Sequence, residues 1–181
     1  MDGFFTALTQ HAFMQTAVAT ALLASIGCGV MGTYVVVKRI AFIAGGIAHS
    51  VLGGMGAAVY FGFEPLHGAL PAAIAAALLI GWVRLHWHAQ EDTLISALWA
   101  IGMAVGVMFI AKAPGYQTDL MSYLFGNILL VPRESLWFMA ALDLVLLASV
   151  AAYHRQFLAV VFDEEFARLR GVPVGFFYLL L

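Results

Sequence analysis

The chain has 181 residues, of which 64% are hydrophobic and only 10% are charged. Soluble domains carry about 25% charged residues, so this composition excludes an ordinary soluble fold and indicates lipid as the solvent. The net charge of −2 gives no reason to expect a nucleic-acid partner, and the single cysteine excludes a disulfide within the chain.

Five apolar runs are long enough to cross a bilayer, which takes about 20 helical residues. They cover residues 4–37, 40–63, 66–83, 93–111 and 135–153. The first run exceeds one span, so its beginning is expected at the membrane interface. Residues 173–181 resemble the first turns of a sixth helix. The sequence therefore predicts an all-α, polytopic transmembrane helix bundle, with residues 1–181 as one domain that is incomplete at its C-terminus.

Basic residues predict how the bundle is oriented, because Lys and Arg accumulate on the cytoplasmic side. If the loop after the first span is inside, six basic residues are cytoplasmic and two are external. The inner set is Lys38, Arg39, Arg84, Arg155, Arg168 and Arg170, and the outer set is Lys112 and Arg133. This bias predicts an external N-terminus.

A histidine lies in the middle of the second apolar run, between small residues. Gly45, His49 and Gly53 share one helical face, and Gly46, Ser50 and Gly54 share the next. Small residues at this spacing let membrane helices approach closely, which predicts that His49 lies on a packing face. An intramembrane histidine is a candidate metal or substrate contact. The alternative is a histidine hydrogen-bonded to a neighbouring helix.

Three further polar residues occur at or within the spans. His86 and His88 flank a tryptophan after the third span, where an interfacial role is favoured over metal binding. Asp143 is the one charge within the fifth span. It could be a ligand, a proton relay or a structural hydrogen-bond acceptor, and the structural role is favoured.

The segment after the fifth span has the features of a short helix. Asp163 is a good N-cap, the first turn is acidic, and Gly171 ends the helix. Glu164 and Arg168 are spaced for an ion pair. The apolar stripe of Phe162, Phe166 and Leu169, together with the mixed charge, suits docking of a soluble protein better than binding to a lipid surface. The residues involved are Asp163, Glu164, Glu165, Phe166, Arg168, Leu169, Arg170 and Gly171.

Several catalytic motifs are absent from the sequence. It contains no phosphate-binding loop, no nucleophile elbow and no zinc-protease motif. No catalytic residue is expected, and the chain does not bind ATP by the phosphate-loop route.

Three segments in order resemble the permease subunits of zinc/manganese ABC importers, the ZnuB-type family. They are residues 32–50, 119–129 and 162–171. The resemblance implies an inner-membrane permease that forms a homodimer and binds two copies of a separate ATPase and an extracytoplasmic metal-binding protein. It also implies that zinc or manganese is the transported substrate, with no permanently bound cofactor.

The same resemblance assigns roles to residues. His49 matches the pathway histidine of the family, and residues 163–171 match the coupling helix. Many members have an aspartate at the position of Gly45, and its absence here slightly favours zinc over manganese.

Three other functions remain open from the sequence. A permease for a metal chelate, such as a siderophore or cobalamin, would share the coupling helix but would not need His49. A membrane redox subunit would need two deep histidines to bind haem. A non-transporting assembly subunit would need neither His49 nor the coupling helix.

Overall fold

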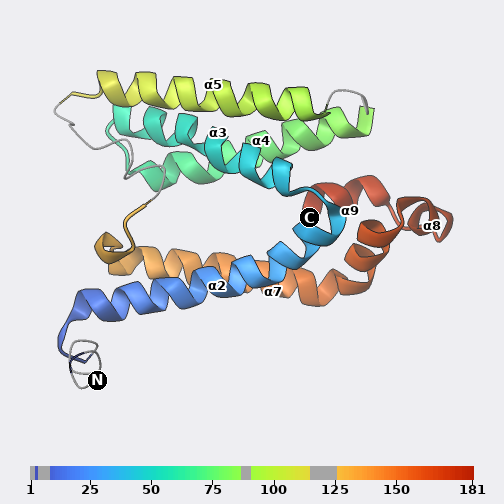
Figure 1. Cartoon of the computed structure of the whole chain (residues 1–181), viewed down its shortest axis with the longest axis horizontal. Coiled ribbons are helices and arrows are strands. Elements are labelled where there is room, and N and C mark those ends of the chain that lie inside the picture. Colours follow the sequence, from blue (N-terminus) through green and yellow to red (C-terminus); the bar gives the residue numbers. More distant parts are fainter. Residues whose placement is uncertain (1–2, 4–8, 87–90, 115–125) are drawn as a thin grey trace.

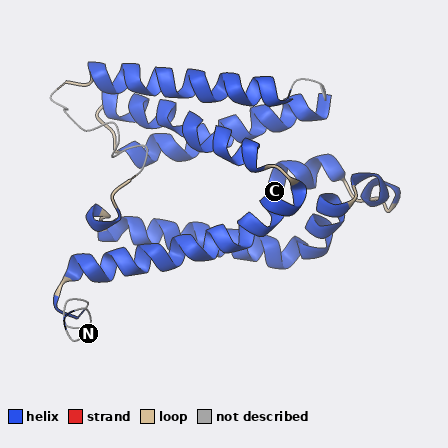
Figure 2. Ribbon diagram, in the orientation of Figure 1, coloured by secondary structure: helices blue, strands red, loops and turns tan. Residues whose placement is uncertain are grey.

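The computed structural model describes residue 3 and residues 9–86, 91–114 and 126–181. Within these ranges all regular structure is helical (Figure 2), as the composition predicted. The long helices are α2 (Ala12–Lys38), α3 (Ala41–Tyr60), α4 (Pro65–His86), α5 (Glu91–Lys112) and α7 (Arg133–Phe162). The short ones are η1 (Ile128–Leu130), α8 (Glu164–Leu169) and α9 (Val174–Leu180).

Each of the five long helices is long and apolar enough to cross a membrane, which confirms the five predicted spans. The fifth was predicted to end at residue 153, whereas α7 continues to Phe162. Tyr153 has non-helical dihedral angles (φ −117°, ψ 17°), so the predicted end coincides with a kink in α7. The polar residues after this kink belong to the same helix, which is why the hydropathy pattern stopped too early.

The helices form two groups (Figure 1). In one group, α3 packs between α4 and α5, and in the other group α2 packs against α7. The groups meet at one end of the molecule, where α2 turns into α3 and where α9 contacts both α4 and α7. A buried cluster at this end includes Tyr34, Phe157 and Phe177 from α2, α7 and α9.

Glycines allow the close packing within the α3–α5 group. A Cβ atom added to Gly54 would collide with the backbone of Gly68 and with Ala72 on α4. One added to Gly53 would lie 3.1 Å from the carbonyl oxygen of Gly102 on α5. The prediction that the small residues of this helix form packing faces is therefore confirmed, because α3 contacts α4 through Gly54 and α5 through Gly53.

Charged residues mark the two ends of the bundle. Lys38 and Arg84 both contact Glu164, so the ends of α2 and α4 lie beside the start of α8. Lys112 and Arg133 lie at the opposite end of the long helices (Figure 1). The two sets of basic residues are thus separated as predicted, and the assignment of the α8 end to the cytoplasm stays a prediction.

Candidate functional site

His49 lies near the middle of α3, and its ring stacks on the indole of Trp99 from α5. The ring centroids are 4.1 Å apart and the planes differ by 11°. The indole is itself held in place, because its Nε1–H donates a hydrogen bond to Sδ of Met103 at 3.1 Å. The orientation of the imidazole is therefore set by a side chain fifty residues later in the sequence.

The edge of the His49 ring is free among the residues that the structure describes. The side chain is half-buried, and neither ring nitrogen has a hydrogen-bond partner within the described ranges. A neutral imidazole has one ring nitrogen without a proton, and the in-plane lone pair of this nitrogen can bind a metal ion or a proton. Stacking covers a face of the ring and leaves this lone pair accessible. The alternative of a histidine hydrogen-bonded to a neighbouring helix is thus not what the described residues show.

Gly45 lies one turn before His49 and faces the same indole. A Cβ atom there would lie 3.6 Å from Cζ3 of Trp99, an ordinary van der Waals contact. The position therefore has room for a Cβ atom. Gly46, in contrast, faces Ile95, and a Cβ atom there would collide with that side chain. Ser50 is buried against Gly102 and donates its hydroxyl to the carbonyl of Ile47 at 2.8 Å, so it is engaged in packing.

The described part of the chain contains no group of three or more His, Cys, Asp or Glu side chains that could hold a metal ion. A metal ion at His49 would therefore have fewer than three such side-chain ligands from these residues. Structural metal sites have about four protein ligands, so the described residues do not form such a site around His49.

Asp143 lies on α7 opposite Gly27 of α2, where a Cβ atom would be 2.8 Å from its Oδ1. Its Oδ2 is buried and has no hydrogen-bond partner in the described residues. The favoured expectation of a structural hydrogen-bond acceptor is therefore not met within those residues. The glycine opposite explains how the carboxylate fits between two closely packed helices.

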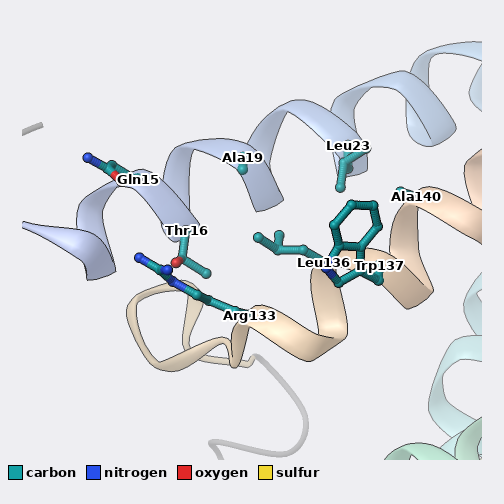
Figure 3. A pocket seen from close by; sticks show the side chains of 8 residues that line it. All are labelled: Gln15, Thr16, Ala19, Leu23, Arg133, Leu136, Trp137 and Ala140. Carbon is teal, nitrogen blue, oxygen red and sulfur yellow. The ribbon is translucent and has the colours of Figure 1, made fainter. Parts of the chain in front are cut away.

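A cavity of about 450 Å³ lies between α2 and α7, in the helix group that does not contain His49. Figure 3 shows Trp137 and Arg133 of α7 facing α2, with Thr16 opposite the guanidinium. Most of its lining is apolar, and it contains no His, Cys, Asp or Glu side chain. This cavity is therefore not a candidate metal site.

Two of the predicted polar segments are only partly described. His86 ends α4 and is exposed, and its Nδ1 lies 2.8 Å from the carbonyl oxygen of Trp82 on the same helix. The interfacial role expected for it stays a prediction. His88 lies outside the described residues, as does most of the segment 119–129.

The predicted short helix is present as α8. The carboxylate of Asp163 accepts a hydrogen bond from the backbone N–H of Phe166 at 2.9 Å, which confirms the N-cap. Gly171 has a φ of 77° and ends the helix, as predicted. Phe162, Phe166 and Leu169 are 73%, 51% and 87% exposed, so this apolar stripe is available for contact with another surface.

The predicted ion pair between Glu164 and Arg168 was wrong. Oε1 of Glu164 lies 2.6 Å from Nζ of Lys38 and 3.3 Å from Nη2 of Arg84. Another arginine of this segment, Arg170, lies over the ring of Phe166, 4.9 Å from its centroid. Helical spacing identified a possible partner on the same helix, whereas the tertiary structure brings two cations from other helices to the carboxylate.

Comparison with known proteins agrees with this architecture of apolar, spanning-length helices. The chain belongs to the ABC 3 transport family, which it matches over residues 10–181. It is therefore a membrane protein of a transport family, and membership of this family, together with the five helices of spanning length, places it in the inner (cytoplasmic) membrane, as predicted.

Several curated relatives have names that refer to metal transport. The chain is 46% identical over 164 residues to the "Probable metal transport system membrane protein" of Chlamydia trachomatis, covering 87% of this chain and 56% of the relative. It is 33% identical over 178 residues to the manganese transport system membrane protein MntC of Halalkalibacterium halodurans, covering 98% of this chain and 61% of the relative. The chain thus spans about three fifths of the length of these relatives.

A solved structure has a similar fold. The chain superposes on PsaBC from Streptococcus pneumoniae, solved in complex with Fab, with a TM-score of 0.83 and 28% identity. The match covers 99% of this chain and 66% of the other.

Proposed function

We propose that this chain is the permease domain of an ATP-driven importer for divalent transition-metal ions, zinc or manganese. The observation that carries the proposal is the geometry of His49. Its imidazole lies at mid-span with both ring nitrogens unbonded among the described residues, and its face is held by Trp99. The family match and the metal-transport names of two relatives support the same class of substrate.

We infer the partners from the separate subunits that an ABC importer uses for ATP hydrolysis, transport and metal binding. The sequence has no phosphate-binding loop, so ATP would be hydrolysed by a separate ATPase. Two copies of this ATPase would bind, one to the α8 of each permease copy. The exposed stripe of Phe162, Phe166 and Leu169 offers these ATPases an apolar surface. A second copy of the permease and an extracytoplasmic metal-binding protein would complete the complex.

The mechanism that we propose uses the two helix groups. Movement of α8 during the ATP cycle would tilt the α2–α7 group relative to the α3–α5 group, because the groups meet at the α8 end. The tilt would open the pathway beside α3 to one side of the membrane and then to the other. His49 would contact the ion through one ring nitrogen, weakly enough to release it.

The choice between the two ions depends on the ligands around His49. A site that relies on imidazole and lacks a carboxylate favours zinc, whereas manganese prefers carboxylate oxygens. Gly45 supplies no carboxylate in this chain. The manganese name of one relative makes manganese the competing substrate to test.

The test is uptake of radioactive zinc and manganese into vesicles that contain the permease, its ATPase and its binding protein. We expect ATP-dependent uptake of one ion, and its loss in His49→Ala. Ser25→Ala is a matched control, because Ser25 is exposed and only bonds to its own helix. Uptake that survives His49→Ala would favour transport of a metal chelate. Absence of uptake of either ion, in a complex that hydrolyses ATP, would contradict the metal assignment.

A further inference from the structure

Three charged side chains form a cluster where the two helix groups meet. Lys38, at the end of α2, donates hydrogen bonds to the carbonyl oxygen of Val160 and to Oε1 of Glu164, both at 2.6 Å. Arg84, near the end of α4, donates to the same Oε1 at 3.3 Å and to the hydroxyl of Tyr178 at 2.8 Å. We call these residues, Lys38, Arg84 and Glu164, the charge cluster.

The charge cluster connects five helices, three of them through one carboxylate. Lys38 links α8 to α2 and, through Val160, to α7, which together form one helix group. Arg84 links α8 to α4 of the other group and, through Tyr178, to α9. Glu164 is the first residue of α8, so the carboxylate lies where α8 is attached to both groups.

The strength of this attachment comes from the burial of Lys38. Its side chain is only 9% exposed, and an ammonium with so little access to water is stable only when it is paired. The side chains of Arg84 and Glu164 are 24% and 33% exposed, so their contact is partly screened by solvent. A displacement of α8 that left Lys38 behind would therefore separate this buried ammonium from its carboxylate and leave it with the carbonyl of Val160 as its partner among the described residues.

We propose that Glu164 transmits the movement of α8 to both helix groups, with Lys38 and Arg84 as its two connections. The proposal rests on the proposed function, because it assumes that α8 is moved by the ATPase. It assigns to Glu164 a role in coupling ATP hydrolysis to transport that is separate from binding the ATPase, for which α8 offers its exposed apolar stripe.

The matched pair of variants is Glu164→Gln and Glu134→Gln. Glu134 lies in the first turn of α7, outside α8 and the charge cluster, is exposed, and forms no ion pair in the described part of the chain. Each complex would be purified with its ATPase and binding protein, and co-purification of the ATPase would measure docking. The readouts are metal taken up per ATP hydrolysed and the ATP-induced change in spin-label distance between α5 and α7.

We expect Glu164→Gln to retain the ATPase and to hydrolyse ATP, while uptake per ATP falls on the order of 10-fold and the change in distance shrinks. Glu134→Gln should match the wild type in both. Equal behaviour of the two variants would overturn the proposal. So would loss of ATPase binding in Glu164→Gln alone, because Glu164 would then act in docking.

A second variant keeps the test decisive if Glu164→Gln does not fold. Arg84→Met removes the connection to α4 and leaves the buried Lys38–Glu164 pair intact. It should lower uptake per ATP and reduce the distance change, and wild-type values in Arg84→Met would also overturn the proposal. If the wild-type complex takes up neither ion, the metal assignment fails, whereas the distance measurement still tests Glu164.

Discussion

A close helix contact in the His49 group offers a quantitative test of the packing argument. A Cβ atom added to Gly102 on α5 would lie 2.5 Å from Cα of Ser50 on α3, whereas ordinary contacts begin at 3.4 Å. The helices would therefore have to separate locally by 3.4 − 2.5, or about 0.9 Å. The position of the Cβ atom is fixed by the backbone of α5, and Cα of Ser50 belongs to the backbone of α3, so no side-chain rotation can relieve the contact.

The control for Gly102→Ala is Gly32→Ala on α2, where an added Cβ atom meets nothing within 4 Å. Both substitutions gain the same helix propensity, up to about 1 kcal/mol, so this gain cancels in the comparison. The difference is the overpacking cost, about 1–3 kcal/mol. In a chain of this size that corresponds to a difference in melting temperature of about 2–12 °C.

The assay is thermal unfolding of the purified permease in detergent, with metal uptake measured in parallel. We expect Gly102→Ala to melt below Gly32→Ala and to lose uptake, because Trp99 lies one turn away and would be moved from His49. Equal melting temperatures would refute the view that glycine contact holds α3 against α5. A lower melting temperature with full uptake would show that the spacing of these helices does not control the pathway.

Three other substitutions test the site. Trp99→Ala should raise the KM for metal uptake on the order of 10-fold, whereas Trp99→Phe keeps a ring for stacking and should not raise it. In a His49→Ala background, Trp99→Ala should cause no further change, and additive effects of the two substitutions would contradict a positioning role for Trp99. Gly45→Asp adds a carboxylate one turn from His49, at a position with room for the added Cβ atom. Manganese uptake relative to zinc should therefore rise on the order of 10-fold, about 1.4 kcal/mol, in competition assays, and an unchanged ratio would place the selective ligands elsewhere. Asp143→Asn removes a buried, unpaired carboxylate oxygen, so the melting temperature should stay level or rise by a few degrees with uptake retained, and loss of uptake in a stable protein would give Asp143 a functional role.

Much of the local structure could be predicted from the sequence. Hydropathy identified the five spanning helices, and the turn residues between them set most of their ends. Asp163 and Gly171 marked the beginning and end of α8, because an N-cap and a C-terminal glycine act on neighbouring backbone groups. The small residues around His49 predicted a packing face, and α5 and α4 do pack there.

The relations between helices required the tertiary structure. Nothing in the sequence connects His49 with Trp99, although Gly102 and Gly106 on α5 repeat the small-residue spacing of α3 and could have suggested that the two helices pair. The ion pair expected for Glu164 within α8 was wrong for the same reason, since the nearest cations come from α2 and α4. Periodicity fixes which residues share a face and where a helix ends, because these depend on local geometry. The side chain that meets each face depends on how the helices pack, and in this protein packing decided both what orients His49 and what Glu164 holds together.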